Sequence, residues 1–244
     1  MKKSDIVNAL GRRHGLRRYL EICTPSTGLT FALVDAACFE PKHRLVYNCP
    51  EEVDDGLAYT YRTSLPFSHE LIATIDTASE GRARYDLIFV DPWHSLKCSA
   101  TDLAGAWRLL RPGGIMVVHD CNPADESLVT ATPRLGEWCG LTYRAFIDFV
   151  LFRRDLRFCT VDTDYGCGVV HKIAAQSELS AADAEALELL QMNWIIARED
   201  DERRYAFFDY DRARLLQLVS VEEFVTREGL DPAPAPATAN GLVV

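Results

Sequence analysis

The residues best suited to chemistry follow two short apolar runs near the middle of the chain. Residues 87–90 (LIFV) lead into Asp91 and His94, and residues 115–118 (IMVV) lead into His119 and Asp120. Apolar runs bracketed by turn residues and separated by a helical period indicate parallel strands covered on both faces. Ligands of such sheets bind beyond the carboxyl ends of the strands. We therefore expect one crevice lined by Asp91, His94, His119, Asp120 and Asn122.

This set of side chains offers two kinds of chemistry. An imidazole just beyond a strand end, such as that of His94, is placed to act as a general base. Two carboxylates with a histidine or amide oxygen suit Mg²⁺ or Mn²⁺, which would lower the pKa of a bound hydroxyl. Plainer interpretations stay open: Asp91 caps the next helix or only contacts a cofactor, and His119 is a hydrogen-bonded core residue.

An alternation of strands and helices must position these residues. It predicts an α/β fold with a doubly wound, mostly parallel sheet, right-handed crossovers and an antiparallel edge hairpin. The expected strands are residues 18–22, 44–49, 58–63, 85–90 and 115–119, with two more inside 157–172 around Asp-Tyr-Gly. The expected helices are residues 4–16, 28–39, 69–80, 99–110 and 139–154, and most of 180–229.

Side chains at the helix starts and the composition near the end refine this division. Ser4 and Ser68 are expected to cap their helices, and Ser220 with Glu223 is spaced as a capping box. Residues 1–175 are expected to form the sheet domain, and residues 176–230 a helical extension packed on it. The Pro/Ala-rich residues 231–244 are expected to be a disordered tail.

Composition excludes several classes of protein. The net charge of −10 argues against binding to nucleic acid or to an anionic membrane. No run of 18 apolar residues and no apolar leader is found, which argues against a membrane span or a signal peptide. The eight scattered cysteines indicate reduced thiols in a cytoplasmic protein. The partners that remain are a small molecule and a second copy of the chain.

Three stretches resemble the class I S-adenosylmethionine-dependent methyltransferases. They are YLEI with a turn ending in Gly28, FVD at the fourth strand, and LLRPGGIMVVHD at the fifth. The pairing of DPWHS with VVHDCNP resembles, more narrowly, the small-molecule O-methyltransferases related to macrolide-sugar and cephalosporin-tailoring enzymes. The resemblance spans residues 17–172 and implies a Rossmann-like fold with S-adenosylmethionine as cofactor.

The resemblance implies a cofactor site at the first strand–helix turn, where glycine lets the backbone approach a ligand closely. Family members usually carry Glu-x-Gly-x-x-x-Gly there, and Glu21 and Gly28 match this pattern whereas Cys23 replaces the first glycine. The family usually ends its second strand with an acid that accepts both ribose hydroxyls, and this chain offers Asn48. The implied cofactor-binding set is Glu21, Cys23, Gly28, Asn48, Asp91 and Trp93.

The resemblance also assigns roles in the reaction. Methyl transfer from a sulfonium is an in-line displacement, so positioning and proton removal supply the rate. The matching histidine of the resembled enzymes is the base, which is His94 here, and the matching aspartates are metal ligands, which are Asp91 and Asp120. Acceptor-binding segments follow strand five in such folds, which singles out Trp138, Tyr143 and Arg144. Arg144 would pair with an anionic acceptor or form a surface ion pair.

We therefore expect methyl transfer to a small molecule, most readily to a hydroxyl oxygen, with nitrogen as an open alternative. A second interpretation is a catalytically degenerate methyltransferase-like binding protein, which Cys23 and Asn48 favour. A third is a dehydrogenase, which the absence of GxGxxG after the first strand disfavours.

Overall fold

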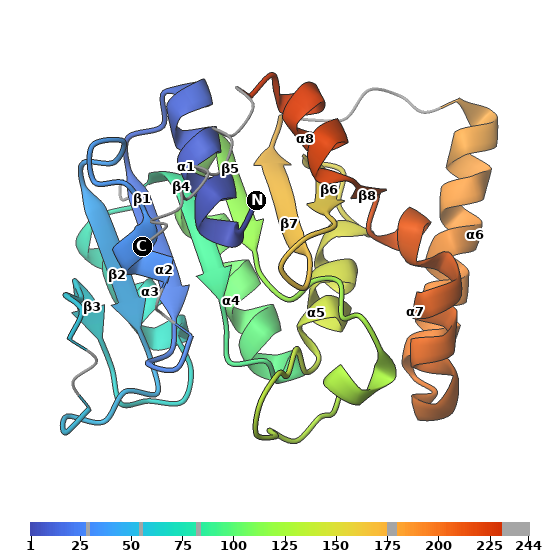
Figure 1. Cartoon of the computed structure of the whole chain (residues 1–244), viewed down its shortest axis with the longest axis horizontal. Coiled ribbons are helices and arrows are strands. Elements are labelled where there is room, and N and C mark those ends of the chain that lie inside the picture. The colour runs from blue at the N-terminus through green and yellow to red at the C-terminus, as the bar shows by residue number, and fades with distance from the viewer. Residues whose placement is uncertain (28–29, 54–55, 82–83, 175–179, 231–244) are drawn as a thin grey trace, which may run out of the picture.

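One twisted sheet organises the molecule. The computed structural model describes residues 1–27, 30–53, 56–81, 84–174 and 180–230. Within them, eight strands form a single sheet in the order β3-β2-β1-β4-β5-β7-β6-β8, with helices on both faces (Figure 1). The predicted doubly wound α/β architecture is confirmed.

Five neighbouring strands run parallel to one another. They are β1 (Tyr19–Cys23), β2 (Lys42–Val46), β3 (Tyr61–Arg62), β4 (Tyr85–Asp91) and β5 (Leu110–Val118). The remaining three are β6 (Leu156–Val161), β7 (Cys167–Lys172) and β8 (Leu218–Val219). β7 is antiparallel to both β5 and β6, as the predicted hairpin requires. The hairpin is not at the edge, however, because β8 pairs with β6 in parallel and takes that place.

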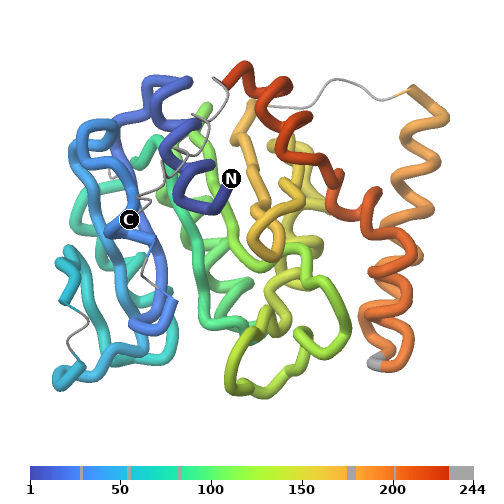
Figure 2. Tube along the Cα trace, in the orientation of Figure 1, coloured from blue at the N-terminus to red at the C-terminus, as the bar shows by residue number. Residues whose placement is uncertain are grey.

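Helices cover the two faces of the sheet with two separate apolar cores. α1 (Lys3–His14), α2 (Thr30–Leu33) and α8 (Val221–Glu228) lie on one face. α3 (His69–Ala78), α4 (Leu96–Leu109) and α5 (Thr142–Val150) lie on the other. α6 (Ala181–Arg198) and α7 (Asp201–Leu215) pack together beyond β8 and α5, and a 3₁₀ turn, η1 (Glu126–Leu128), lies in the long loop after β5 (Figure 2).

Successive side chains of β4 point alternately to the two faces of the sheet. Leu87 and Phe89 belong to the core under α1, whereas Ile88 and Val90 belong to the core under α4. Successive side chains of a strand point to opposite faces, so Asp91 falls on the α1 side. The same alternation in β5 continues from Ile115 and Val117 toward His119.

The second predicted helix is wrong over most of its length. Of residues 28–39, only Thr30–Leu33 are helical, and residues 28–29 lie outside the described part of the chain. Asp35 ends the helix because its Oδ1 atom accepts the N–H of Ala37 at 2.9 Å, while its own N–H is bound by Asn8. Lys42 caps the C-terminal end of α2 by donating to the carbonyl oxygens of Phe31 and Val34.

Two of the predicted helix caps are also wrong. Ser4 lies inside α1, whose N-cap is Lys2, and Asp5 accepts the Lys2 N–H at 2.8 Å. Ser68 stands at the start of α3 but does not cap it, because its hydroxyl donates to Asp102 of α4 instead. The capping box of Ser220 and Glu223 is confirmed, and α4 begins earlier than expected because Ser95 caps it.

Several strand and helix ends differ from the expected ones. β2 ends at Val46, and Asn48 follows in a left-handed conformation with φ of 50°. β3 is reduced to Tyr61–Arg62 and α5 to Thr142–Val150. Residues 111–114 (RPGG) form an irregularity inside β5, since Leu110 and Ile115 both pair with β4.

The C-terminal part contains the predicted helices and also contributes β8 to the sheet. The division into residues 1–175 and 176–230 stays a prediction, and residues 231–244 lie outside the described residues. Among the described residues, no helix has the length and apolar character needed to cross a bilayer.

Candidate active site

A cavity of about 400 Å³ opens at the carboxyl ends of β1, β4 and β5. Four of the five residues predicted to converge line it: Asp91, His94, His119 and Asp120. Asn122 lines a neighbouring cavity of about 620 Å³ instead, where its amide donates to Asp162 at 3.0 Å. The turn formed by Asp164 and Tyr165 lines both cavities and thus lies between them.

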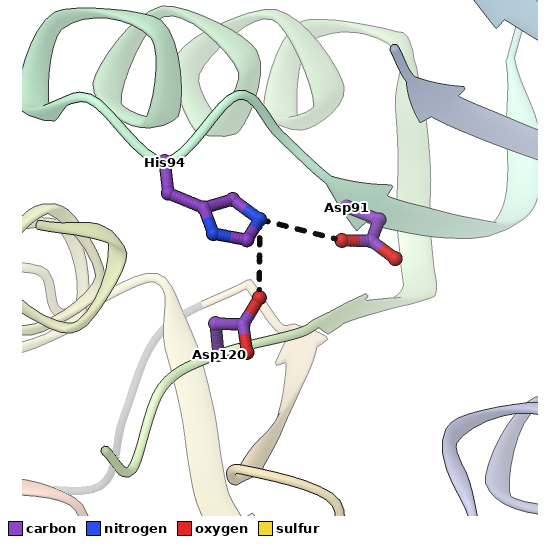
Figure 3. A group of neighbouring side chains, drawn as sticks. All are labelled: Asp91, His94 and Asp120. Carbon is purple, nitrogen blue, oxygen red and sulfur yellow. Dashed lines mark ion pairs between the residues drawn. The ribbon is translucent and has the colours of Figure 1, made fainter. Parts of the chain in front are cut away.

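The imidazole of His94 lies between two carboxylates (Figure 3). Its Nε2 atom is 3.2 Å from Oδ2 of Asp120 and 3.9 Å from Oδ1 of Asp91. The three side chains are 11%, 5% and 2% exposed, in the order His94, Asp120, Asp91. One ligand atom from each lies within 4.8 Å of the others, which is compact enough to surround a metal ion.

The loop after β5 fixes the orientation of His94. The carbonyl oxygen of Trp138 can only accept, so His94 Nδ1 donates to it. The Trp138 indole stacks on the imidazole with ring centroids 5.1 Å apart. The backbone is held as well, since the N–H of Leu141 donates to the His94 carbonyl at 2.7 Å. Nε2 is therefore the ring nitrogen left for a ligand, and it is buried without a hydrogen-bond partner.

Ion pairing favours the charged forms of Asp91, His94 and His119 despite their burial. Burial raises the pKa of Asp91, but His119, His94 and Lys3 lower it well below its ordinary value. Burial opposes protonation of His94, yet Asp91 and Asp120 raise its pKa. His119 behaves in the same way, with its pKa raised by Asp91 and Asp120 against the effect of burial.

Two charged residues of the centre escaped the sequence analysis. Lys3, in the first turn of α1, places Nζ 2.9 Å from Oδ2 of Asp91. Asp164, expected to serve only a turn, lies 3.8 Å from Nε2 of His119, and its pKa is lowered to about 2, with His119 the largest cause. The signal for Lys3 was present, because Lys3, Ile6, Val7 and Leu10 share one face of a helix.

Residues of the first strand–helix turn reach the cavity. Ser26, Thr27 and Thr30 line it, and the Thr27 hydroxyl donates to the backbone oxygen of Asp91 at 2.8 Å. This bond ties the turn after β1 to the end of β4. The predicted set contained no residue from 24 to 27, because the family pattern marks only Glu21 and the two glycine positions of this turn.

The predicted cofactor residues are scattered. Glu21 is fully buried, accepts the Tyr19 hydroxyl at 2.8 Å, and has its pKa raised to about 8 by burial. Cys23 is buried and lies beside Asp91 in the sheet register, whereas Asn48 is exposed. None of these three described residues lines the cavity. Gly28 lies outside the described residues.

The predicted acceptor residues divide in a similar way. Trp138 lines the cavity, and Trp93, which was predicted as a cofactor residue, packs edge-on against Trp138 with ring centroids 5.3 Å apart. Tyr143 is buried against Phe208 of α7. Arg144 forms the ion pair that was the plainer interpretation, with Glu199 at 3.3 Å.

Comparison with known proteins agrees with this fold. A family profile described as a methyltransferase domain matches residues 13–121. No curated protein matches the chain at a significant level.

Two solved structures share the fold. The O-methyltransferase TomG from Streptomyces achromogenes, involved in tomaymycin synthesis and solved in complex with SAM, is 17% identical, with a TM-score of 0.51 and coverage of 70% of this chain and 80% of that one. Cofactor-bound Rv0187 from MTB is 14% identical, with a TM-score of 0.51 and coverage of 71% and 80%. At these identities the two structures support the fold alone. The match over residues 13–121 indicates a methyltransferase domain in this part of the chain, and the shared fold agrees with it.

Proposed function

We propose that the chain transfers a methyl group from S-adenosylmethionine to a hydroxyl oxygen of a small molecule, with His94 as general base. The proposal rests on the two ring nitrogens of His94, which lines the cavity. Nε2 is buried without a hydrogen-bond partner, whereas Nδ1 donates to the Trp138 carbonyl oxygen. TomG, which shares the fold, is described as an O-methyltransferase.

The residues around His94 suit proton removal. An acceptor hydroxyl in the cavity would pass its proton to Nε2 as its oxygen attacks the methyl group. Asp120 would stabilise the resulting imidazolium, and the Trp138 carbonyl would keep the ring oriented. A positioned base of this kind contributes roughly 10²–10⁴-fold to the rate.

The cofactor would occupy the side of the cavity next to the first turn. When bound, S-adenosylmethionine supplies a methyl group on a positively charged sulfur. Ser26, Thr27 and the carboxylate of Asp91 line that side and offer polar contacts. The other predicted contacts, at Glu21, Cys23, Gly28, Asn48 and Trp93, stay part of the proposal. Tyr143 and Arg144 are weaker acceptor candidates than Trp138 because of their present partners.

The centre also fits a divalent cation. Two buried carboxylates beside an unpartnered imidazole nitrogen are a donor set that Mg²⁺ or Mn²⁺ accepts. Asp91 and Asp120 would hold the ion, which would lower the pKa of a bound hydroxyl. Nε2 cannot be both a ligand and the base, so we assign it to the base and leave the ion to the carboxylates.

One set of observations favours the alternative of a degenerate binding protein. Glu21 and Cys23 are buried away from the cavity, and Asn48 is exposed. A protein that kept the fold without tight cofactor binding would have this pattern.

The lack of nucleic-acid binding, a homo-oligomeric state and a cytoplasmic location also stay predictions.

Calorimetric titration with S-adenosylmethionine, with and without Mg²⁺, distinguishes the two functions. We expect saturable binding, followed by cofactor consumption when a panel of hydroxylated and amine-bearing small molecules is supplied. Enthalpy changes no larger than dilution heats in both buffers would favour the degenerate scaffold.

A further inference from the structure

We infer that Lys3 places a fixed positive charge in this centre and thereby weakens the binding of a divalent ion by Asp91 and Asp120. The inference deepens the proposed active site, and it rests on that proposal only for the role of the two carboxylates.

The contacts of Lys3 place its charge inside the centre. Nζ lies 2.9 Å from Oδ2 of Asp91 and 3.4 Å from Nδ1 of His119. The Asp91 side chain is 2% exposed and that of Lys3 25% exposed. The two oxygens of Asp91 are thus divided, with Oδ2 facing the ammonium and Oδ1 facing His94 and His119.

The fold directs Lys3 to this position. Lys3 continues the stripe of Ile6, Val7 and Leu10 that packs α1 on the sheet. Asp91 continues the alternation of β4 toward the same face. Figure 1 shows α1 lying over the sheet with the N-terminus toward the carboxyl end of β4, so the two patterns meet at this ion pair.

The first turn of α1 is also tied down. The Lys3 N–H donates to Oδ2 of Asp164 at 3.1 Å, and the Thr163 hydroxyl donates to the Met1 carbonyl at 2.6 Å. Both acceptor and donor belong to the turn between β6 and β7. A surface lysine loses side-chain entropy when it forms an ion pair. Here the contacts of the first turn fix the Lys3 backbone near Asp91, so the side chain loses less entropy when the pair forms.

A divalent ion held by Asp91 and Asp120 would lie within a few ångströms of this ammonium. Like charges at such a separation repel strongly in a partly buried site. The ion must therefore displace Lys3 or bind beside it at a cost, so Lys3 lowers the affinity of the site.

Electron paramagnetic resonance titration with Mn²⁺ on the purified full chain tests this inference. We expect Lys3→Met, which keeps the length of the side chain but removes its charge, to bind Mn²⁺ roughly tenfold more tightly than the wild type, or better. Lys3→Arg restores the charge and should bind as weakly as the wild type. Arg12→Met removes a charge from the exposed face of the same helix and should leave the affinity unchanged. Lys3→Gln repeats the test if Lys3→Met folds poorly.

Equal Mn²⁺ affinity in Lys3→Met, Lys3→Gln and the wild type would overturn the inference and leave Lys3 as an anchor of α1. Absence of Mn²⁺ binding from all variants would overturn it as well. Neither result depends on methyl transfer, since titration of the same samples with S-adenosylmethionine reports separately on the proposed function.

Discussion

Trp138 and His94 are joined twice, by a hydrogen bond from Nδ1 to the Trp138 carbonyl and by stacking of their rings at 5.1 Å. The two residues are 44 positions apart, and one lies in the loop after β5 while the other precedes α4. Because Nδ1–H donates a hydrogen bond to the carbonyl oxygen, the neutral imidazole keeps its proton on Nδ1 and its lone pair on Nε2. The loop thus selects the tautomer that the proposed base requires.

Replacing His94 with glutamine should lower kcat by roughly 10²–10⁴-fold, because the proposed proton acceptor is lost. Binding of S-adenosylmethionine should persist. The base must be deprotonated, so activity should be present above the pKa of His94 and fall as the pH drops through it. Since Asp91 and Asp120 raise that pKa, the fall should begin above the ordinary histidine value of 6.5. Profiles of kcat/KM against pH for wild type and variant measure this.

His69→Gln is the matched control, because His69 is 60% exposed on α3. Its profile should superimpose on that of the wild type. An unchanged kcat in His94→Gln at neutral pH would remove the base from the mechanism.

Gly140→Ala should displace His94 and reduce activity by roughly tenfold or more, as misplaced catalytic groups do. Gly140 has a φ of 53°, and an added Cβ would collide with the His94 carbonyl oxygen and contact its Cβ at 2.7 Å. Gly136 has a φ of 87° with no atom within 4 Å of such a Cβ. Gly136→Ala therefore carries the backbone strain, about 1 kcal/mol, without the collision. Parallel assays of activity and thermal stability compare the two; equal activity losses would place the effect in strain alone.

Local patterns predicted the sheet well but not the contacts between distant segments. β4 and β5 were recognisable because buried parallel strands are continuous apolar runs, and their ends gave Asp91, His94 and Asp120. The Lys3–Asp91 pair joins residues 88 positions apart, which needs the helix stripe and the strand alternation to be combined in three dimensions. Ser68 resembled a cap, but a partner 34 positions away, Asp102, took its hydroxyl. Asp35 ended α2 through a side-chain bond that competes with the helix.

Asp102→Asn should make the protein more stable at pH 8 than the wild type. Asp102 is fully buried in α4, and burial raises its pKa to about 7, against the hydrogen bonds from Ser68 and Tyr47. The unfolded chain loses this proton near its ordinary value of 3.8, so the stability of the wild type falls as the pH rises from about 4 to 7. Asparagine has no proton to lose there and can still accept from Ser68.

Urea unfolding at pH 5 and pH 8 measures this effect. The difference in free energy of unfolding between variant and wild type should shift by roughly 3 kcal/mol in favour of Asp102→Asn between the two conditions. Asp102→Ala, which leaves the Ser68 hydroxyl without its acceptor, should be less stable than Asp102→Asn at both. A difference that does not change with pH would mean that Asp102 ionises normally in the folded protein.

Glu228→Gln should destabilise the protein at neutral pH and have progressively less effect in acid. Glu228 ends α8 with a side chain 3% exposed, and its two oxygens lie 3.0 Å from Nε2 of His14 and 3.0 Å from Nε2 of His171. Arg157 adds a guanidinium 3.5 Å away. Burial opposes ionisation, but His171, Arg157 and His14 lower the pKa of Glu228 to about 2. A carboxylate with a lowered pKa stabilises the fold above its unfolded value of 4.5 and loses that contribution as the pH falls toward 2.

Melting curves of wild type and Glu228→Gln between pH 7 and pH 3.5 follow this loss. At pH 7 the Tm of the variant should be lower by several degrees, because the cluster joins α8 to α1 and to the adjacent strands β6 and β7. The gap should be constant down to about pH 4.5 and then narrow. Glu222→Gln, on the exposed side of the same helix, should melt like the wild type throughout. A gap that stays constant to pH 3.5 would show that Glu228 contributes through packing, because the loss of a charge interaction must follow its titration.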